Sequence, residues 1–233
     1  MFLKRMVIIV SGLLMITAPV LQAGDTASFV DLGFSADGAM YMFAQYGVKS
    51  GVLKPWADLF IVDVARNDFV PGGRISFTRD KPIEAGQNGS AALYQIMTKN
   101  VGLIERYDVS YPNQGQPLYI ALTGDPAYEG AEISFRDFVS GISYRAKLAE
   151  KIMGSGKDIR SSFYITLESI DSDGEAKTFT IGTPELERPS IFSYRIKQVL
   201  IAPSGNSLLF VIEMKRHADN GHDIRYMVEA LRL

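Results

Sequence analysis

Two stretches of the chain share one pattern, an apolar segment, a turn and a second apolar segment. They are Phe34–Phe43, with Asp37-Gly38 at its turn, and Ile201–Phe210, 167 positions further on. Glycine accepts a positive φ without steric cost, so a polar residue followed by glycine between apolar segments favours a β-hairpin. A third strand-like segment follows each copy, at Ala57–Val64 and His222–Leu231. The pattern predicts a repeated antiparallel unit of three strands.

Most of the remaining sequence also has the composition of strands. Further strands are predicted at Leu118–Thr123, Ala131–Phe138, Ile142–Ile152, Ser162–Ile170 and Ala176–Ile181. Along Ile142–Ile152 apolar and polar residues alternate, which is typical of a strand that buries one face. The segment Arg145–Met153 also suits a helix by propensity, so a helix is the alternative there. The turn residues at Asp171–Gly174 predict one more hairpin.

One segment has the periodicity of a helix. Its apolar residues recur at spacings of three and four, namely Leu93, Ile96, Met97, Val101 and Ile104. This spacing places them on one face of an α-helix. We therefore predict a helix from Ala91 to Arg106, with Ser90 as its N-cap and Gly102 as its weakest point.

Together these elements predict a mainly β fold. We expect a single domain over residues 24–233, made of antiparallel meanders with a helical insertion at about 90–106. Closing a repetitive sheet protects its edge strands, so the two end units are expected to lie side by side like β-propeller blades. Because only two such units can be recognised in the sequence, a β-sandwich is the alternative fold.

Residues 1–23 have the parts of a signal peptide. Lys4 and Arg5 precede an apolar stretch from Met6 to Thr17, and Ala23 is a small residue at a plausible cleavage position. The apolar stretch is shorter than the roughly 20 residues that span a bilayer. We predict cleavage after Ala23 and a periplasmic or secreted protein without a membrane span after cleavage. An uncleaved anchor is the alternative.

Composition limits the possible chemistry. The chain contains no cysteine, so lipid attachment at a lipobox cysteine, disulfides and thiolate metal sites are excluded. Without residues 1–23 it carries 22 basic and 26 acidic residues, and no basic run exceeds two residues. Binding to nucleic-acid phosphates needs clustered positive charge, so no nucleic-acid partner is expected. The sequence leaves the oligomeric state open.

Short motifs resemble known families. The Phe-Ser-x-Asp-Gly turn at Phe34–Gly38 resembles blades of periplasmic TolB-like β-propellers, although the first copy has Ala36 where proline is common and the second has Ser204 where aspartate is common. The stretches Phe34–Val48 and Leu59–Gly72, with Ile224–Glu229, are similar to DUF2259, a family of predicted secreted bacterial proteins of unknown function. This resemblance implies export and a β-rich fold, and it implies no catalytic residues.

An aromatic cluster surrounds a predicted loop at Gly47–Pro55. Tyr46 and Trp56 flank this loop, and Tyr41 and Phe43 precede it. Aromatic faces beside a loop can bind a glycan or a peptide by stacking. Packing between strands is the favoured interpretation for the group, with Trp56 expected to be its most exposed member. Tyr46 and Trp56 are the candidate ligand-binding residues.

The two histidines of the chain lie in one short segment. His217 and His222 are accompanied by Asp219 and Asp223, and imidazoles with carboxylates are ligands for Zn²⁺ or Ca²⁺. The spacing matches no established metal motif, and Asn220-Gly221 by itself favours a hairpin turn. The favoured interpretation is a hairpin, with a metal site at these four residues as the alternative.

No catalytic motif is recognisable. The sequence lacks a Gly-x-Ser-x-Gly elbow, and Gly154–Lys157 lacks the rest of a P-loop. We therefore expect a non-enzymatic binding or scaffolding module of the cell envelope, without a cofactor, whose partner is an envelope protein or a glycan. A metal-dependent hydrolase that uses His217, Asp219 and His222 is the alternative.

Overall fold

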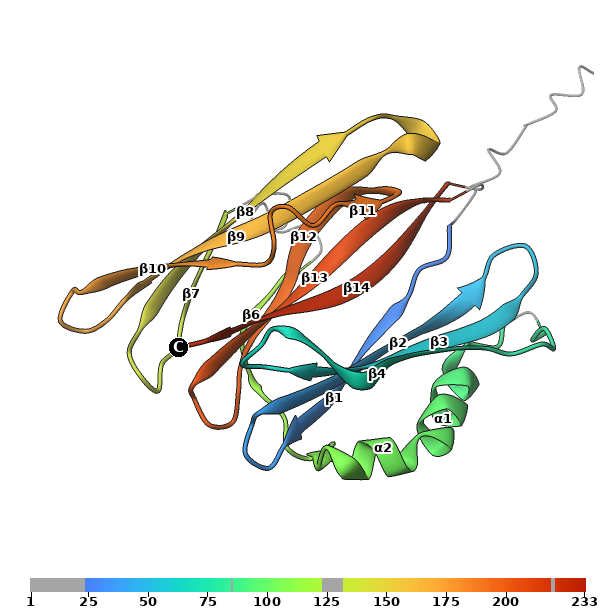
Figure 1. The fold of residues 1–233 in the computed structure, drawn as a ribbon, viewed down its shortest axis with the longest axis horizontal. Coiled ribbons are helices and arrows are strands. Elements are labelled where there is room, and N and C mark those ends of the chain that lie inside the picture. Colours follow the sequence, from blue (N-terminus) through green and yellow to red (C-terminus); the bar gives the residue numbers. More distant parts are fainter. Residues whose placement is uncertain (1–23, 85, 123–131, 219–220) are drawn as a thin grey trace, which may run out of the picture.

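A computed structural model describes residues 24–84, 86–122, 132–218 and 221–233. These residues form three antiparallel sheets that stack as layers, with two short helices covering one end of the stack (Figure 1). The mainly β fold predicted from the sequence is confirmed, and the sheets form no closed barrel among the described residues.

The N-terminal sheet contains the first copy of the repeated unit. Its strand order is β4-β3-β2-β1-β5. The strands are β1 (Ser28–Ser35), β2 (Met40–Lys49), β3 (Lys54–Asp63), β4 (Asp68–Thr78) and β5 (Val109–Ser110). Because β2 and β3 pair as far as Lys49 and Lys54, the predicted loop at Gly47–Pro55 is only a short turn.

The middle sheet contains the second copy, in the order β14-β13-β12-β6, and the outer sheet has the order β10-β9-β8-β7. The middle strands are β6 (Gln116–Ile120), β12 (Ile191–Ile201), β13 (Ser207–Ala218) and β14 (Gly221–Arg232). The outer strands are β7 (Glu132–Arg136), β8 (Ser143–Met153), β9 (Arg160–Ile170) and β10 (Ala176–Ile181), and the short β11 (Arg188–Pro189) pairs with β9. The segment that also suited a helix is therefore part of strand β8.

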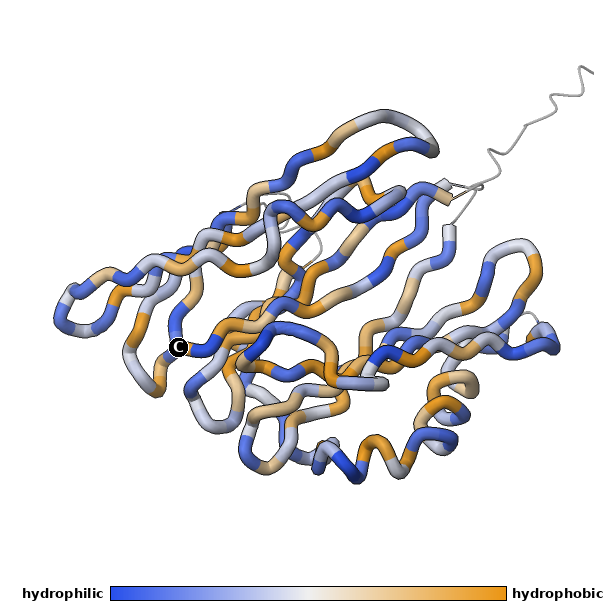
Figure 2. The backbone as a smooth tube through the Cα atoms, viewed as in Figure 1, coloured by the Kyte–Doolittle hydropathy of each residue, from blue (hydrophilic) through white to orange (hydrophobic). Residues whose placement is uncertain are grey.

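The middle sheet is buried on both faces. Residues 208–212 of β13 are all fully buried. One face of this sheet packs on the outer sheet through residues such as Phe210 and Phe163, and the other packs on the N-terminal sheet through residues such as Leu209 and Phe43. In the outer sheet hydrophobic and hydrophilic positions alternate along the strands, since only one face is covered (Figure 2). The layers thus follow from how many apolar faces each sheet has to bury.

The two repeated units form the predicted hairpins, and these hairpins stack face to face. Gly38 and Gly205 both have a positive φ, of 71° in each case. The two turns lie against each other, because a Cβ added to Gly38 would be 3.0 Å from Ser204 Oγ. The units belong to different sheets, so the expected side-by-side pairing is wrong. Strands with apolar side chains on both faces need cover above and below, and face-to-face packing provides it.

The helical insertion is confirmed, but it forms two helices instead of the single helix predicted. It consists of α1 (Ser90–Lys99) and α2 (Val101–Arg106). The break falls at Asn100, whose side-chain amide donates a hydrogen bond to the carbonyl of Ile96 at 2.7 Å. The residue at the N-cap of α1 is Gly89 instead of Ser90. Buried residues of α1 cover the face of the N-terminal sheet that points away from the middle sheet.

Candidate functional site

The segment at Gly24–Ala27 lies along the outer edge of β14. The backbone amide of Ala27 donates to the carbonyl of Ile224 at 3.1 Å, and the amide of Ile224 donates to the carbonyl of Asp25 at 3.0 Å. Gly24 packs so closely that an added Cβ would lie 1.7 Å from the carbonyl oxygen of His222. This segment therefore covers backbone groups of an edge strand that would otherwise be unpaired.

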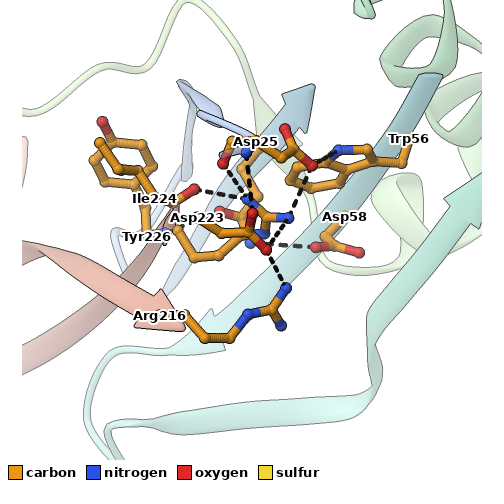
Figure 3. A network of polar contacts seen from close by, with 9 residues as sticks. Asp25, Trp56, Asp58, Arg216, Asp223, Ile224 and Tyr226 are labelled. Carbon is orange, nitrogen blue, oxygen red and sulfur yellow. Dashed lines mark hydrogen bonds and ion pairs between the residues drawn. The ribbon is translucent and has the colours of Figure 1, made fainter. Parts of the chain in front are cut away.

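A buried ionic network lies directly beneath this segment, and Figure 3 shows it from close by. We use the name Asp25 network for Asp25, Trp56, Arg216, Asp223 and Arg225. The Asp25 carboxylate accepts hydrogen bonds at Oδ2 from the indole N–H of Trp56, at 2.5 Å, and from Arg225, at 2.9 Å. The backbone amide of Asp25 donates to Asp223 Oδ1 at 3.0 Å. The network therefore joins the N-terminal segment, strand β3 and strand β14.

Arg225 is the centre of the Asp25 network. Its guanidinium donates to the backbone carbonyls of Asp25 and Ile224, both at 2.8 Å, and lies 4.2 Å from the centre of the Trp56 ring. It also contacts Asp223, which forms a second ion pair with Arg216 at 2.6 Å. The cation is thus held by two carboxylates and one aromatic face.

The pKa values of the two buried carboxylates are shifted in opposite directions. Burial raises the pKa of Asp25 above its ordinary value, and Arg225 and the Trp56 hydrogen bond offset only part of that rise. Burial also raises the pKa of Asp223, but hydrogen bonds from Arg216 and from the Asp25 amide outweigh it, so the pKa of Asp223 is lowered. The second oxygen of Asp25, Oδ1, is buried without a hydrogen-bond partner among the described residues, and it rests against Gly47.

The structure separates the two predicted ligand-binding aromatics. Trp56 is only 4% exposed, so the prediction that it is the most exposed member of its group is wrong. Its ring packs between the N-terminal and middle sheets, whereas half-buried Tyr46 packs on the helix-covered face. Tyr46 pairs with Ala57, one position from Trp56, and adjacent positions of a strand point to opposite faces. Core packing, the favoured interpretation, is confirmed for Tyr41 and Phe43.

The predicted histidine segment forms the β13–β14 hairpin. His217 and His222 are directly opposite each other, and both rings lie near Phe192. Asp223 is opposite Arg216, one position further along, and therefore points to the other face of the sheet. Asp219 lies outside the described residues. Within the part of the chain that the structure describes, no three histidine or acidic side chains gather as metal ligands.

A second buried polar cluster connects all three sheets. Asn67 in the β3–β4 turn accepts a hydrogen bond from the backbone amide of Ala230, at 2.6 Å, and donates one to the carboxylate of Glu229. Arg188, beside the outer sheet, approaches the same carboxylate at 3.5 Å and lies over the ring of Phe163. Burial raises the pKa of Glu229, while Asn67 and Arg188 oppose that rise. The side chain of Asn67 also covers the edge of β14.

Neither Arg225 nor Glu229 is among the site residues predicted from the sequence. One signal was present, because both interrupt the otherwise apolar end of the chain at 224–231. A charged residue in a buried strand needs a partner, and here the partners lie far away in sequence. Asp25 and Arg225, for example, are 200 positions apart. The carboxylates of Asp25 and Glu229 each contact residues of two different sheets, so these contacts stabilise the stack of sheets.

Comparison with known proteins gives one match. Neither the curated proteins nor the solved structures include a match to this chain. None of the helices that the structure describes is long and apolar enough to cross a bilayer. The model of a family described as predicted secreted protein (DUF2259) matches residues 42–232, which include the whole of the middle and outer sheets but not strand β1. Because this match covers most of the chain, the protein belongs to the DUF2259 family of predicted secreted proteins.

Proposed function

We propose that the protein is exported by a signal peptide that is cleaved after Ala23, and that it acts outside the cytoplasm as a non-enzymatic binding or scaffolding module. Membership of a family of secreted proteins supports export. The docking of Gly24 and Asp25 on β14 supports this cleavage position, since a mature chain that begins at Gly24 keeps these contacts.

The proposed binding role rests on one observation, the exposed apolar tip of the β7–β8 hairpin. Phe138 is 85% exposed and Val139 is 83% exposed. Two adjacent apolar side chains so fully exposed at a turn are typical of a contact with a partner. The buried ion pairs, in contrast, hold the sheets together, so the stack of sheets serves as a rigid support for this tip.

We expect the mature protein to begin at Gly24. Expression of the full chain in a bacterial host, followed by N-terminal sequencing and intact-mass measurement of the exported fraction, checks this prediction. A mature protein that starts at residue 30 or later would lack the Asp25 network and would contradict the cleavage position.

The binding role is tested with a photo-crosslinking amino acid at position 138. We expect an adduct in cells that make the protein, because the tip contacts its partner there. The matched control carries the same crosslinker in place of Tyr94, which is also exposed but lies on α1. Adducts of equal yield at both positions, or none at position 138, would count against a binding role for the tip.

A further inference from the structure

We propose that the β7–β8 hairpin is a membrane-contacting element that inserts Phe138 and Val139 into the interface of a bilayer containing anionic phospholipids. The inference rests on the proposed function and names the partner of the same tip. Three observations carry it, the rigidity of the tip, a depression beside it and the basic residues that line this depression.

The tip is held in one conformation by Asp137. Its carboxylate accepts hydrogen bonds from the backbone amides of Val139, at 2.9 Å, and Ser140, at 3.3 Å, and from the Ser140 hydroxyl, at 2.5 Å. The amide of Gly141 closes the turn on the carbonyl of Asp137. Phe138 and Val139 therefore project outward from a preformed turn, and their exposure requires no unfolding. Preorganisation of this kind lowers the entropic cost of binding.

A depression of about 400 Å³ adjoins the tip. It is lined by Ser134, Phe135, Arg136, Ser143, Tyr144, Arg145 and Ile170. Arg136 pairs with Ser143, and Ser134 pairs with Arg145, so the two small hydroxyl side chains lie between the two long cationic ones. The pair Arg136–Ser143 directly precedes the turn that carries Phe138. The depression thus lies next to the apolar tip on the same hairpin.

The polar groups of this depression suit a phosphate. Arg136 is exposed and makes no ion pair with any residue that the structure describes. Arg145 forms ion pairs with Glu132 and Glu168, at 3.7 and 3.5 Å, and all three side chains are substantially exposed. Exposed pairs of this length contribute little to stability, so Arg145 can turn toward a phosphate. Guanidinium and hydroxyl donors together match the oxygens of a phospholipid headgroup.

Apolar insertion and headgroup binding reinforce each other at one place. Peripheral membrane proteins commonly place aromatic and aliphatic side chains at the level of the acyl chains and arginines at the level of the phosphates. An isolated anion site would not need the exposed Phe138, and a purely apolar protein partner would not need the exposed Arg136. A reversible contact with an anionic membrane surface accounts for both.

The experiment uses fluorescence of a Phe138→Trp variant. The native chain has a single tryptophan, Trp56, which is buried and therefore gives a constant background. The protein is titrated with phosphatidylcholine vesicles that contain or lack phosphatidylglycerol. The matched control is Leu186→Trp, because Leu186 is exposed near β11, which pairs with the opposite end of β9 from Ile170.

We expect a blue shift of the emission at position 138 with phosphatidylglycerol vesicles and none at position 186. Adding Arg136→Gln should weaken this binding about fivefold, the effect of one basic residue at an anionic surface. In vesicle sedimentation of the otherwise native chain, Phe138→Ala should weaken binding about tenfold or more, the effect of losing a buried aromatic side chain.

Other outcomes would overturn the inference. They are the absence of a shift at position 138, equal shifts at both positions, and equal binding to vesicles with and without phosphatidylglycerol. Glycerol phosphate serves as the soluble probe. If it stabilises the folded protein but the protein does not bind vesicles, the depression is an anion site only. A protein adduct in the crosslinking experiment together with no vesicle binding would leave the proposed function in place and exclude the membrane.

Discussion

Replacement of Arg225 by methionine is expected to lower the stability of the protein by about 3–5 kcal/mol, because it leaves the buried Asp25 carboxylate without its cation. The side chain of Arg225 is 16% exposed and that of Asp25 is 5% exposed, so water cannot replace the lost contacts. In a protein of this size 1 kcal/mol corresponds to about 2–4 °C in Tm, so a decrease of roughly 6–20 °C is expected. Thermal unfolding followed by circular dichroism measures it.

Two variants separate the lost ion pair from a general effect of removing arginine. Arg216→Met removes a cation that is 44% exposed and contacts the same Asp223, so its cost should stay near 1 kcal/mol or below. Asp25→Asn combined with Arg225→Met removes both buried charges and should recover much of the loss. If the double variant were no more stable than Arg225→Met alone, the unpaired carboxylate would not be the cause.

The pH dependence of Arg225→Met gives an independent check. Burial raises the pKa of Asp25 in the folded state, and Arg225 is the largest opposing influence, so the pKa rises further without Arg225. A carboxyl whose folded pKa lies above its unfolded pKa binds its proton first in the folded state, so stability rises as the pH falls through the folded pKa. The stability deficit of the variant relative to the native protein should therefore shrink from pH 7 toward the ordinary aspartate pKa of about 3.9. A deficit that stayed constant with pH would contradict this assignment.

Replacement of Asn67 by aspartate is expected to have the second large effect, on the order of 4 kcal/mol at pH 7. The amide of Asn67 donates to the buried carboxylate of Glu229, and a carboxylate in its place would oppose a like charge across a hydrogen-bond distance. At an effective dielectric constant near 20, two charges about 4 Å apart interact with about 4 kcal/mol. Denaturant unfolding at pH 7 measures the loss.

Two further variants identify the source of this loss. Asn67 has a φ of 51°, a conformation that glycine adopts freely, so Asn67→Gly removes the side chain without backbone strain. It should cost only about 1–3 kcal/mol, the usual cost of leaving the buried Ala230 amide unpaired. Glu229→Gln in the Asn67→Asp background reverses donor and acceptor and should restore much of the stability. Failure of this rescue would show that like-charge repulsion is not the cause.

The Asn67→Asp variant should also become more stable as the pH falls. Repulsion between the two carboxylates raises the pKa of one of them, so the folded pair binds a proton at pH values where the unfolded chain has lost it. Stability then rises as the pH falls through the raised folded pKa of the pair. The native protein lacks this second carboxyl, so the difference between the two proteins should narrow in acid.

Local features of the structure followed from the sequence. Asp37-Gly38 and Ser204-Gly205 sit at the turns of the hairpins, and the strand predicted at Ala176–Ile181 has these same bounds in the structure. Turn chemistry and the alternation of side chains act over a few residues, so they can be seen without knowledge of the fold. The spacing of apolar residues predicts the helix and Gly102 as its weakest point, whereas the helix breaks at Asn100, whose hydrogen bond to Ile96 has no local signal in the sequence.

The candidate sites were less predictable. The sequence predicts Trp56 and Asp223 in two separate candidate sites, whereas the structure brings both into the Asp25 network. Their link runs through Asp25 and Arg225, which carry no local motif. Tyr46 and Trp56 are ten positions apart in sequence and lie on opposite faces of one sheet, because the register pairs Tyr46 with Ala57 and not with Trp56.

The sequence by itself determined that the chain is mainly β, where its hairpins turn, that one amphipathic segment is helical, and that it is similar to a family of secreted proteins. Each of these rests on residues close together in the chain. Only the tertiary structure decided that the repeated units stack face to face, that a cation and a carboxylate 200 positions apart are buried together, and that Phe138 remains exposed. The physical reason is that burial and charge pairing depend on which sheet covers which face. That arrangement is determined by the free energy of folding of all three sheets together.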